Sequence, residues 1–336
     1  MRKNVKKQLA LRVLSTAALM AMVSSIATAA FAEEYDLNKG SVTVETKDNG
    51  NTYVTQANTE TTDHLDTTGV TITSNGEETS NTITVETAKD QTTNVTLDNV
   101  FINREKASDS DAKAALTVKG DGDTNIELNK NNTLSSTGAH AGLEKTDAEC
   151  SGTLTIKDDV NDDGKLLAGG YEDSAGIGGG SYHDGKSYGN TSNITITGGD
   201  ITAVGGVYGA GIGGGSDEDA SNIRIEGNAH VAAFSNSGAG IGSGYFSNGN
   251  SDITITDHAT VEAASLEGCG IGGSRLASGK ATITISGNAS VKAEALDSAA
   301  AIGSEQSSAT VNIEDNAAVT AVSHGVAIGT CLLYTS

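Results

Sequence analysis

The stretch Ser221-Asn-Ile-Arg-Ile-Glu-Gly-Asn-Ala-His-Val-Ala-Ala, followed by Gly238-Ala-Gly-Ile-Gly-Ser-Gly, decides the fold of this chain. Almost all of the sequence after residue 150 is a variation on it. Two apolar residues that flank a polar one recur in each copy, at 154–156, 194–196, 223–225, 253–255, 283–285 and 311–313. From residue 196 onward the pattern returns every 28 to 30 residues. A fixed period in this range is the signature of a repeat architecture.

Each copy contains two further apolar segments. One begins at Ile201, Val231, Val261, Val291 and Val319, and the other is a glycine-rich segment with its isoleucine at 177, 212, 241, 271, 302 and 328. In all three segments the apolar side chains lie two residues apart, which is strand periodicity. Three short strands cannot bury a face alone, but stacked coils give each strand a parallel partner about 4.8 Å away. The sequence therefore predicts an all-β, three-sided parallel β-helix of about 30 residues per coil, right-handed by default.

The corners and the composition agree with this fold. Asn228, Asn288 and Asn316 follow the first strand of their coils. Asparagine tolerates the left-handed conformation of a tight corner, and stacked asparagines can form a hydrogen-bonded ladder. We therefore expect these asparagines to be the left-handed corner residues. The chain of 336 residues contains no proline, which fits a parallel ladder that uses nearly every backbone N–H.

Four segments are expected along the chain. Residues 1–32 have a basic start, an apolar middle and an Ala30-Phe31-Ala32 cleavage site, so they are predicted to be a signal peptide. Residues 33–150 are predicted to form less regular N-terminal coils and a cap, and residues 151–330 the regular repeats. Residues 331–336 resemble translated sequencing-adapter read-through, so we expect a non-native tail of a truncated chain.

The signal peptide predicts an exported bacterial protein, secreted or at the cell surface. Its apolar run is too short for a confident membrane span, so no membrane insertion of the mature fragment is expected. The chain has 21 Lys and Arg against 43 Asp and Glu, a net charge of −22, which argues against nucleic acid or an anionic membrane as a partner. Cys150, Cys269 and Cys331 have no disulfide or zinc-site pattern.

One acidic turn resembles half of a calcium-binding loop. Asp159, Asn161 and Asp163 supply oxygen atoms at the first, third and fifth positions, before Gly164. The twelfth position is Gly170, where such a loop requires a carboxylate. We therefore expect no cofactor, with calcium at these three residues as the alternative to a plain acidic turn.

The scarce aromatic residues gather on the loop after the third segment. These candidate ligand-binding residues are Tyr182, Tyr188, Tyr245 and Phe246, with Asp217 between them. Tyr182, Asp217 and Phe246 each lie five residues beyond their coil's isoleucine, so on a solenoid they would stack along one edge. Exposed rings beside carboxylates and amides suit a sugar, whereas the alternative is that the rings only cover loop backbone.

Catalytic residues are not evident in the sequence. Polysaccharide hydrolases and lyases need clustered carboxylates near a base. The repeated strand positions here are mostly threonine, serine, alanine and asparagine, and Asp257-His258 and Ser323-His324 are isolated pairs at corners. We therefore expect a protein that is not an enzyme.

The run Gly152-Thr-Leu-Thr-Ile, then Ala175-Gly-Ile-Gly-Gly-Gly, then Ile194-Thr-Ile-Thr-Gly-Gly-Asp-Ile-Thr-Ala resembles bacterial exported repeat proteins. These are β-helix or carbohydrate-binding-domain surface proteins of gut Firmicutes, and the solenoid is also similar to autotransporter passengers. The resemblance covers about residues 115–330. It implies a glycan-binding or adhesin-like role with a glycan or host-surface ligand, and it transfers no binding residue. A passive stalk or passenger is the alternative, and a polysaccharide lyase or hydrolase is the third hypothesis.

Overall fold

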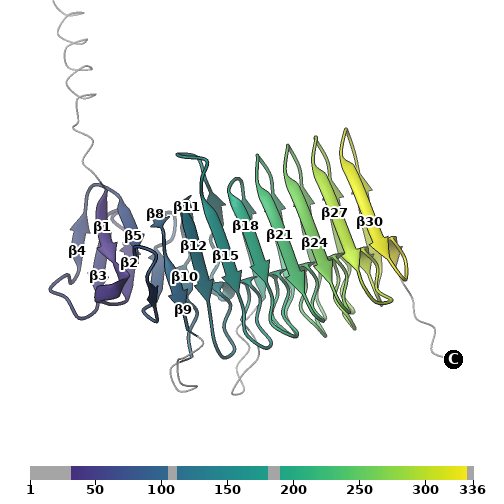
Figure 1. Cartoon of the computed structure of the whole chain (residues 1–336), viewed down its shortest axis with the longest axis horizontal. Coiled ribbons are helices and arrows are strands. Elements are labelled where there is room, and N and C mark those ends of the chain that lie inside the picture. Colours follow the sequence, from purple (N-terminus) through teal and green to yellow (C-terminus); the bar gives the residue numbers. More distant parts are fainter. Residues whose placement is uncertain (1–31, 105–111, 181–189, 331–336) are drawn as a thin grey trace, which may run out of the picture.

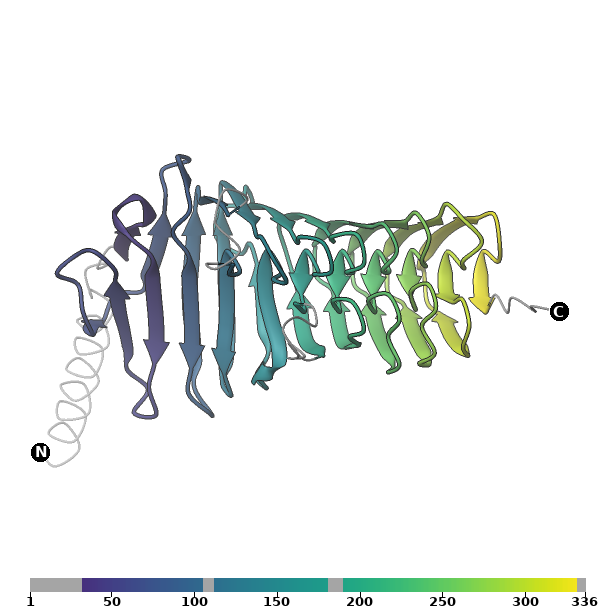
Figure 2. The same ribbon diagram turned by 90° about the horizontal axis from the view of Figure 1, so that it is seen from below.

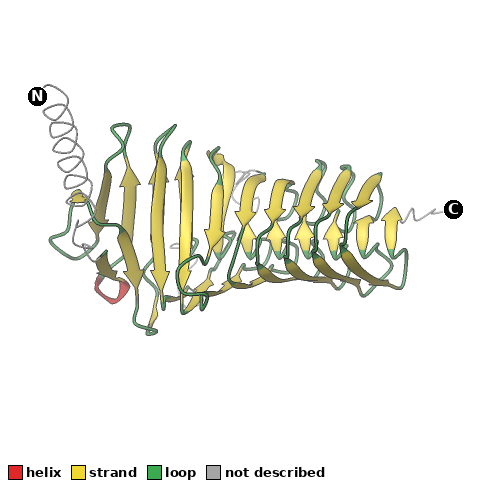
Figure 3. Ribbon diagram, turned by 90° about the horizontal axis from the view of Figure 1, so that it is seen from above, coloured by secondary structure: helices red, strands yellow, loops and turns green. Residues whose placement is uncertain are grey.

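The computed structural model describes residues 32–104, 112–180 and 190–330. This part of the chain winds into an elongated solenoid whose coils stack along one axis (Figure 1). The earliest and the last coils lie at opposite ends (Figure 2). Strands dominate, and the short 3-10 helix η1 (Leu37–Lys39) is the one helix among the described residues (Figure 3). The predicted all-β parallel solenoid is confirmed.

The strands form three sheets, named A, B and C, in the described part of the chain. Sheet A contains, in spatial order, β1 (Glu33–Asp36), β5 (Val70–Thr73), β8 (Thr92–Asp98), β11 (Asp123–Asn129), β14 (Leu154–Lys157), β17 (Thr191–Ile196), β20 (Ala220–Ile225), β23 (Ser251–Ile255), β26 (Ala281–Ile285) and β29 (Ala309–Ile313). Sheet C contains β6 (Glu78–Thr79), β9 (Phe101–Asn103), β12 (Asn131–Ser135), β15 (Lys165–Gly169), β18 (Asp200–Val204), β21 (His230–Ser235), β24 (Thr260–Ser265), β27 (Ser290–Ala295) and β30 (Ala318–Ser323). Sheet B contains β4 (His64–Asp66), β3 (Thr52–Gln56), β2 (Val42–Thr46), β7 (Ile83–Thr87), β10 (Leu116–Gly120), β13 (Leu143–Cys150), β16 (Ile177–Gly178), β19 (Ile212–Gly213), β22 (Ile241–Gly242), β25 (Ile271–Gly272), β28 (Ile302–Ser304) and β31 (Ile328–Thr330).

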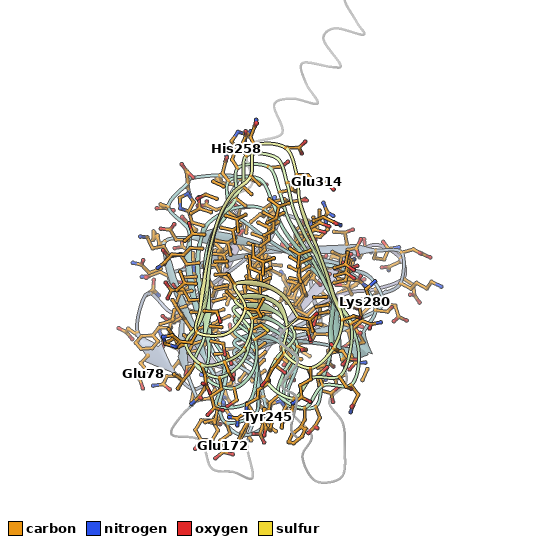
Figure 4. All side chains as sticks on the ribbon, turned by 90° about the vertical axis from the view of Figure 1, so that its right-hand side faces the viewer. Glu78, Glu172, Tyr245, His258, Lys280 and Glu314 are labelled. Carbon is orange, nitrogen blue, oxygen red and sulfur yellow. The ribbon has the colours of Figure 1, made fainter. Side chains whose placement is uncertain are left out.

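A regular coil visits the sheets in the order A, C, B. Strands of neighbouring coils pair in parallel with identical residue types in register, as in Ile223 of β20 opposite Ile253 of β23. The strands of sheet C face the viewer in Figure 1 and run downward while the coils advance to the right, so the solenoid is right-handed (Figures 1 and 4). The inward isoleucines form columns with no exposed surface, for example Ile225, Ile255 and Ile285. Burial of this continuous apolar column stabilises the stack.

Glycines set the third side of each regular coil. Sheet B narrows to strands of two residues there, and Gly213, Gly242 and Gly272 have φ angles of 135°, 139° and 122°. A Cβ on Gly242 would lie 1.9 Å from the carbonyl oxygen of Gly272 in the next coil. The coils therefore stack closely on this side only because no side chain stands between them.

The corner between sheets A and C differs from the prediction. The left-handed residue is the one before each asparagine, at Gly227, Gly287 and Asp315, with φ angles of 65°, 66° and 58°. The expectation for the asparagines themselves was wrong, because glycine and aspartate also tolerate this conformation and stand at the corner position that needs it. Asn316 donates to Asn288 Oδ1 at 3.2 Å, so the predicted ladder is present between these two coils.

Sheet B begins with an antiparallel hairpin instead of parallel coils. Strand β2 pairs antiparallel with β3, which pairs antiparallel with β4, while the other edge of β2 pairs in parallel with β7. Buried threonine hydroxyl groups bond to one another near the hairpin: Thr87 lies 2.7 Å from Thr93 of its own coil and 3.0 Å from Thr124 of the next coil.

The predicted signal peptide, residues 1–32, lies outside the described residues except for Ala32, and the predicted tail, residues 331–336, lies outside them entirely.

Candidate functional site

The loops between sheets B and A carry the predicted ligand-binding residues that the structure describes. Asp217 lies between β19 and β20, and Tyr245 and Phe246 lie between β22 and β23, one coil further. Tyr182 and Tyr188 lie outside the described residues. Figure 4 shows Tyr245 at the lower edge of the solenoid, opposite the corner that carries His258.

Coil stacking brings two of the predicted residues into one row. Asp217 and Phe246 have φ angles of 64° and 61°, and Leu276 takes the same place in the next coil with a φ of 59°. The amide of Asp217 donates to Tyr245 O at 2.7 Å, and the amide of Phe246 donates to Arg275 O at 3.3 Å. The predicted stacking of Asp217 and Phe246 is confirmed. A left-handed bulky residue is uncommon and costs free energy, so the surrounding loops must hold it in place.

A third aromatic side chain, Tyr208, joins this row from another loop. Its ring centroid is 5.1 Å from that of Tyr245, whose ring meets Phe246 edge-on at 4.4 Å. The amide of Tyr245 donates to Tyr208 O at 2.9 Å. Tyr208 and Phe246 are 40% and 47% exposed, so the cluster presents ring surface to solvent. We call Tyr208, Tyr245 and Phe246 the aromatic edge.

Sequence analysis missed Tyr208 because it lies on the loop between sheets C and B, 37 residues before Tyr245. The short strands of sheet B bring that loop next to the loop between sheets B and A. A signal was present, because Tyr208 precedes the glycine-rich segment of its own coil. Using this signal would have required knowing that the loops before and after the short strands of sheet B lie at the same edge of the solenoid.

Charged groups fix the loop beside the aromatic edge. Arg275 Nη1 pairs with Glu267 Oε2 at 2.7 Å, and the same oxygen accepts the Ser237 hydroxyl at 2.8 Å. The Ser237 hydroxyl and the Arg275 guanidinium lower the pKa of Glu267. Glu305 is buried and accepts the amide of Leu276 at 3.0 Å, and its burial raises the pKa of that carboxyl. These contacts hold Arg275 and Leu276 beside Phe246.

The predicted calcium residues lie on the turn between β14 and β15. Each has a protein partner: Asp159 accepts from Lys157 Nζ at 2.8 Å, Asn161 donates to Asn129 Oδ1 at 3.0 Å, and Asp163 accepts the amide of Lys130 at 3.2 Å. Asp158, the residue before them, closes the turn by accepting the amides of Asp162 and Gly164 at 3.1 and 2.7 Å. Protein contacts alone therefore account for this turn, and the calcium site stays a prediction.

Other chemically reactive groups are buried or dispersed. Within residues 32–104, 112–180 and 190–330, no group of three histidine, cysteine, aspartate or glutamate side chains is arranged to hold a metal ion. Cys269 packs among Ala295, Ala299 and Ala300, as a small buried side chain. Over the same residues, no helix has the length and apolar character needed to span a membrane.

Comparison with known proteins agrees with the fold. Residues 194–216 and 253–275 match the model of a family described as the beta helix repeat. Each match runs from sheet A through sheet C to sheet B and into the following loop, so it covers most of one coil. Together with the structure, it defines this chain as a parallel β-helix repeat protein. No curated protein and no solved structure matches the chain significantly.

Proposed function

We propose that this chain is a non-catalytic, exported bacterial surface protein that binds a glycan at the aromatic edge. The observation that carries the proposal is the exposed cluster of Tyr208, Tyr245 and Phe246 on two stacked loops. Rings of this kind offer an apolar face to a sugar, while hydroxyl and charged groups beside them can bond its hydroxyl groups. Asp217 and Arg275 supply charged side chains next to the edge, because the amide of Asp217 donates to Tyr245 O and the amide of Phe246 donates to Arg275 O.

The charge of the chain favours an uncharged glycan as the ligand. The net charge is −22, and the loops that flank the aromatic edge carry Glu172, Asp173 and Asp217. An acidic polysaccharide would be repelled by this surface, and the repulsion would weaken with salt. The one guanidinium of the edge, Arg275, is already paired with Glu267. A neutral sugar meets no such penalty.

Two carboxylates beside the aromatic edge, Glu267 and Glu305, are held in structural contacts, which favours a binding role over a catalytic one. A glycosidase needs one carboxyl group as an acid and a second as a base or nucleophile, both exposed to the sugar. Glu267 is engaged by Arg275 and Ser237, and Glu305 is 3% exposed and holds a backbone amide. Both carboxylates therefore already stabilise the loop through these contacts.

A passive stalk is the second candidate function. The long axis of the solenoid and its uniform stacking are the observations that favour it (Figure 2). A stalk needs length and stiffness but no affinity for a ligand. The two functions are therefore separated by whether the aromatic edge binds a ligand with saturable affinity.

A glycan array tests the proposal. The purified chain is compared with the double variant Tyr245→Ala/Phe246→Ala and with Tyr53→Ala, which removes a ring from the N-terminal hairpin. The proposal expects defined neutral glycans to bind the wild type and Tyr53→Ala but not the double variant. Binding that survives in the double variant would place the site elsewhere. An empty array with folded protein, checked by circular dichroism, would favour the stalk.

A further inference from the structure

A groove of 590 Å³ crosses the outer face of sheet C, away from the aromatic edge. Five neighbouring strands, β12, β15, β18, β21 and β24, line it, so it runs along the axis of the solenoid. Its lining residues are Asn131, Asn132, Thr133, Lys165, Leu166, Leu167, Asp200, Ile201, Thr202, His230, Val231, Ala232, Thr260 and Glu262. Sheet C faces the viewer in Figure 1.

The register of the strands explains why this face is hollowed. Outward side chains of successive coils form rows, and the middle row passes through Thr202 and Ala232, which are small. The row on one side carries Asp200 and His230 at the same two coils, and the row on the other carries Val204 and Phe234. The groove lies over the first two of these rows, where the small Thr202 and Ala232 stand beside the larger Asp200 and His230.

Larger side chains flank the two central coils of the groove, at β18 and β21. Toward β12, Leu167 of β15 is 45% exposed in the middle row, and Lys165 pairs with Asp200 at 3.2 Å. At the other end Glu262 follows Ala232 in the middle row, and the next coil places Lys292 there. Five strands about 4.8 Å apart give a channel on the order of 20 Å long.

The walls of the groove have different chemistry. Leu167, which is 45% exposed, and Ala232 make one side apolar. Asp200 and His230 make the other side polar, and the hydroxyl groups of Thr202 and Thr260 face the same space. An elongated ligand with apolar faces and many hydroxyl groups fits this division.

The groove does not suit an anion or an added peptide strand. Its one lysine is neutralised by Asp200, and Glu262 adds a negative charge, so a phosphate or polyuronate finds no unpaired cation among the lining residues. A peptide that binds by strand addition needs an exposed sheet edge. Strands β15, β18 and β21 are each paired on both sides, so their backbone groups are already used.

We propose that the sheet C groove is a second binding site, which takes one extended, uncharged polysaccharide chain lying along the solenoid axis. The site lies on a different face from the aromatic edge and does not depend on it. One outward row supplies one polar side chain per coil, so each successive sugar unit of one chain meets a polar group; the row is Asn131, Lys165, Asp200, His230 and Thr260.

Nuclear magnetic resonance of the histidine side chains tests this site directly. The full chain, labelled with ¹⁵N at histidine, is titrated with linear oligosaccharides of β-glucan, xylan, mannan and α-glucan. His230 lines the groove, whereas His258 lies at the corner between sheets A and C and serves as an internal reference. At least one oligosaccharide is expected to shift the His230 signals and leave those of His258 unchanged.

Two matched variants locate the binding. Ala232→Trp fills the floor of the groove, and Thr320→Trp places the same ring in the same outward row at β30, beyond the groove. The groove variant is expected to weaken the His230 response at least tenfold, and the control is expected to leave it unchanged. Both positions face outward, so folding is checked by circular dichroism and by the unchanged His258 signals.

The proposal is overturned if no oligosaccharide moves the His230 signals, or if Ala232→Trp binds as tightly as the wild type. The double variant Tyr245→Ala/Phe246→Ala separates this site from the aromatic edge. A His230 shift that persists in the double variant supports an independent groove. If the double variant abolishes the shift while Ala232→Trp does not, the groove proposal fails and glycan binding at the aromatic edge stands.

Discussion

The substitution Gly242→Ala tests the physical reason for the glycine column of sheet B. Its Cβ would lie 1.9 Å from Gly272 O, a backbone atom of the next coil, so the two coils would have to separate. The same oxygen accepts the amide of Ser243 at 3.2 Å, so separation also weakens a ladder hydrogen bond. The φ of 139° adds backbone strain for any residue with a Cβ.

The cost follows from these two effects. A residue forced into a conformation suited only to glycine costs about 1 to 3 kcal/mol, and a weakened hydrogen bond adds about 1 kcal/mol. We therefore expect Gly242→Ala to lower the free energy of unfolding by about 3 kcal/mol. Gly169→Ala is the matched control, because its nearest atom is Ser135 Oγ at 3.8 Å and its row carries a valine in the next coil.

Urea unfolding, followed by circular dichroism, measures the change in the free energy of unfolding for both variants. Hydrogen exchange then shows which coils lose stability, because each coil of a solenoid contacts only its neighbours. Protection is expected to fall in β22 and β25 and to stay unchanged in β8 and β11. A Gly242→Ala protein within about 0.5 kcal/mol of the wild type would refute close coil stacking as the reason for the glycine.

Four further predictions concern two glutamates, calcium and the buried hydroxyl groups. Burial raises the pKa of Glu305, so its ionisation costs stability above that pKa, and Glu305→Gln should raise the melting temperature near neutral pH. That gain should vanish as the pH falls below the ordinary pKa of glutamate, and a gain that persists in acid would contradict it. Glu267 has a lowered pKa, so Glu267→Gln should instead lower the melting temperature near neutral pH, and the loss should vanish as the pH falls through the lowered pKa. Millimolar calcium should leave the melting temperature unchanged by calorimetry, because Asp159 already pairs with Lys157; a rise that Asp159→Ala abolishes would establish the calcium site. Thr87→Val removes a buried hydroxyl with two hydroxyl neighbours and should cost about 1 to 3 kcal/mol in urea unfolding, and an unchanged midpoint would show that the threonine network contributes little.

The repeat predicted the solenoid because its restrictions are local and periodic. Inward positions two residues apart, such as Ala239 and Ile241, must be apolar in every coil, and both are fully buried. The same periodicity placed Asp217 and Phe246 in one row, because equal offsets from the isoleucine become equal heights on the stack. These features needed only the period and the alternation of side chains.

The corner residues and the N-terminal hairpin were harder to predict. Asparagine tolerates a left-handed conformation, but so do glycine and aspartate, and the conformation falls on Gly287 and Asp315 while Asn288 and Asn316 form the ladder. A pair of strands with an Asn-Gly turn, as at Asn49-Gly50, fits a coil corner or a hairpin equally well by local sequence. The neighbour of β2 distinguishes the two alternatives, and β3 pairs with β2 in antiparallel orientation, which makes the turn a hairpin.

The sequence by itself determined the class of fold, the coil length, the inward columns and the edge on which Asp217 and Phe246 stack. Only the tertiary structure decided that Tyr208 joins the aromatic edge, because two-residue strands in sheet B bring two separate loops together. It also decided where sheet C is hollowed, since the small Thr202 and Ala232 of two successive coils lie between the larger Leu167 and Glu262 in the same outward row. The buried positions follow from the pattern within each repeat, whereas a binding surface depends on which different side chains of neighbouring coils come together.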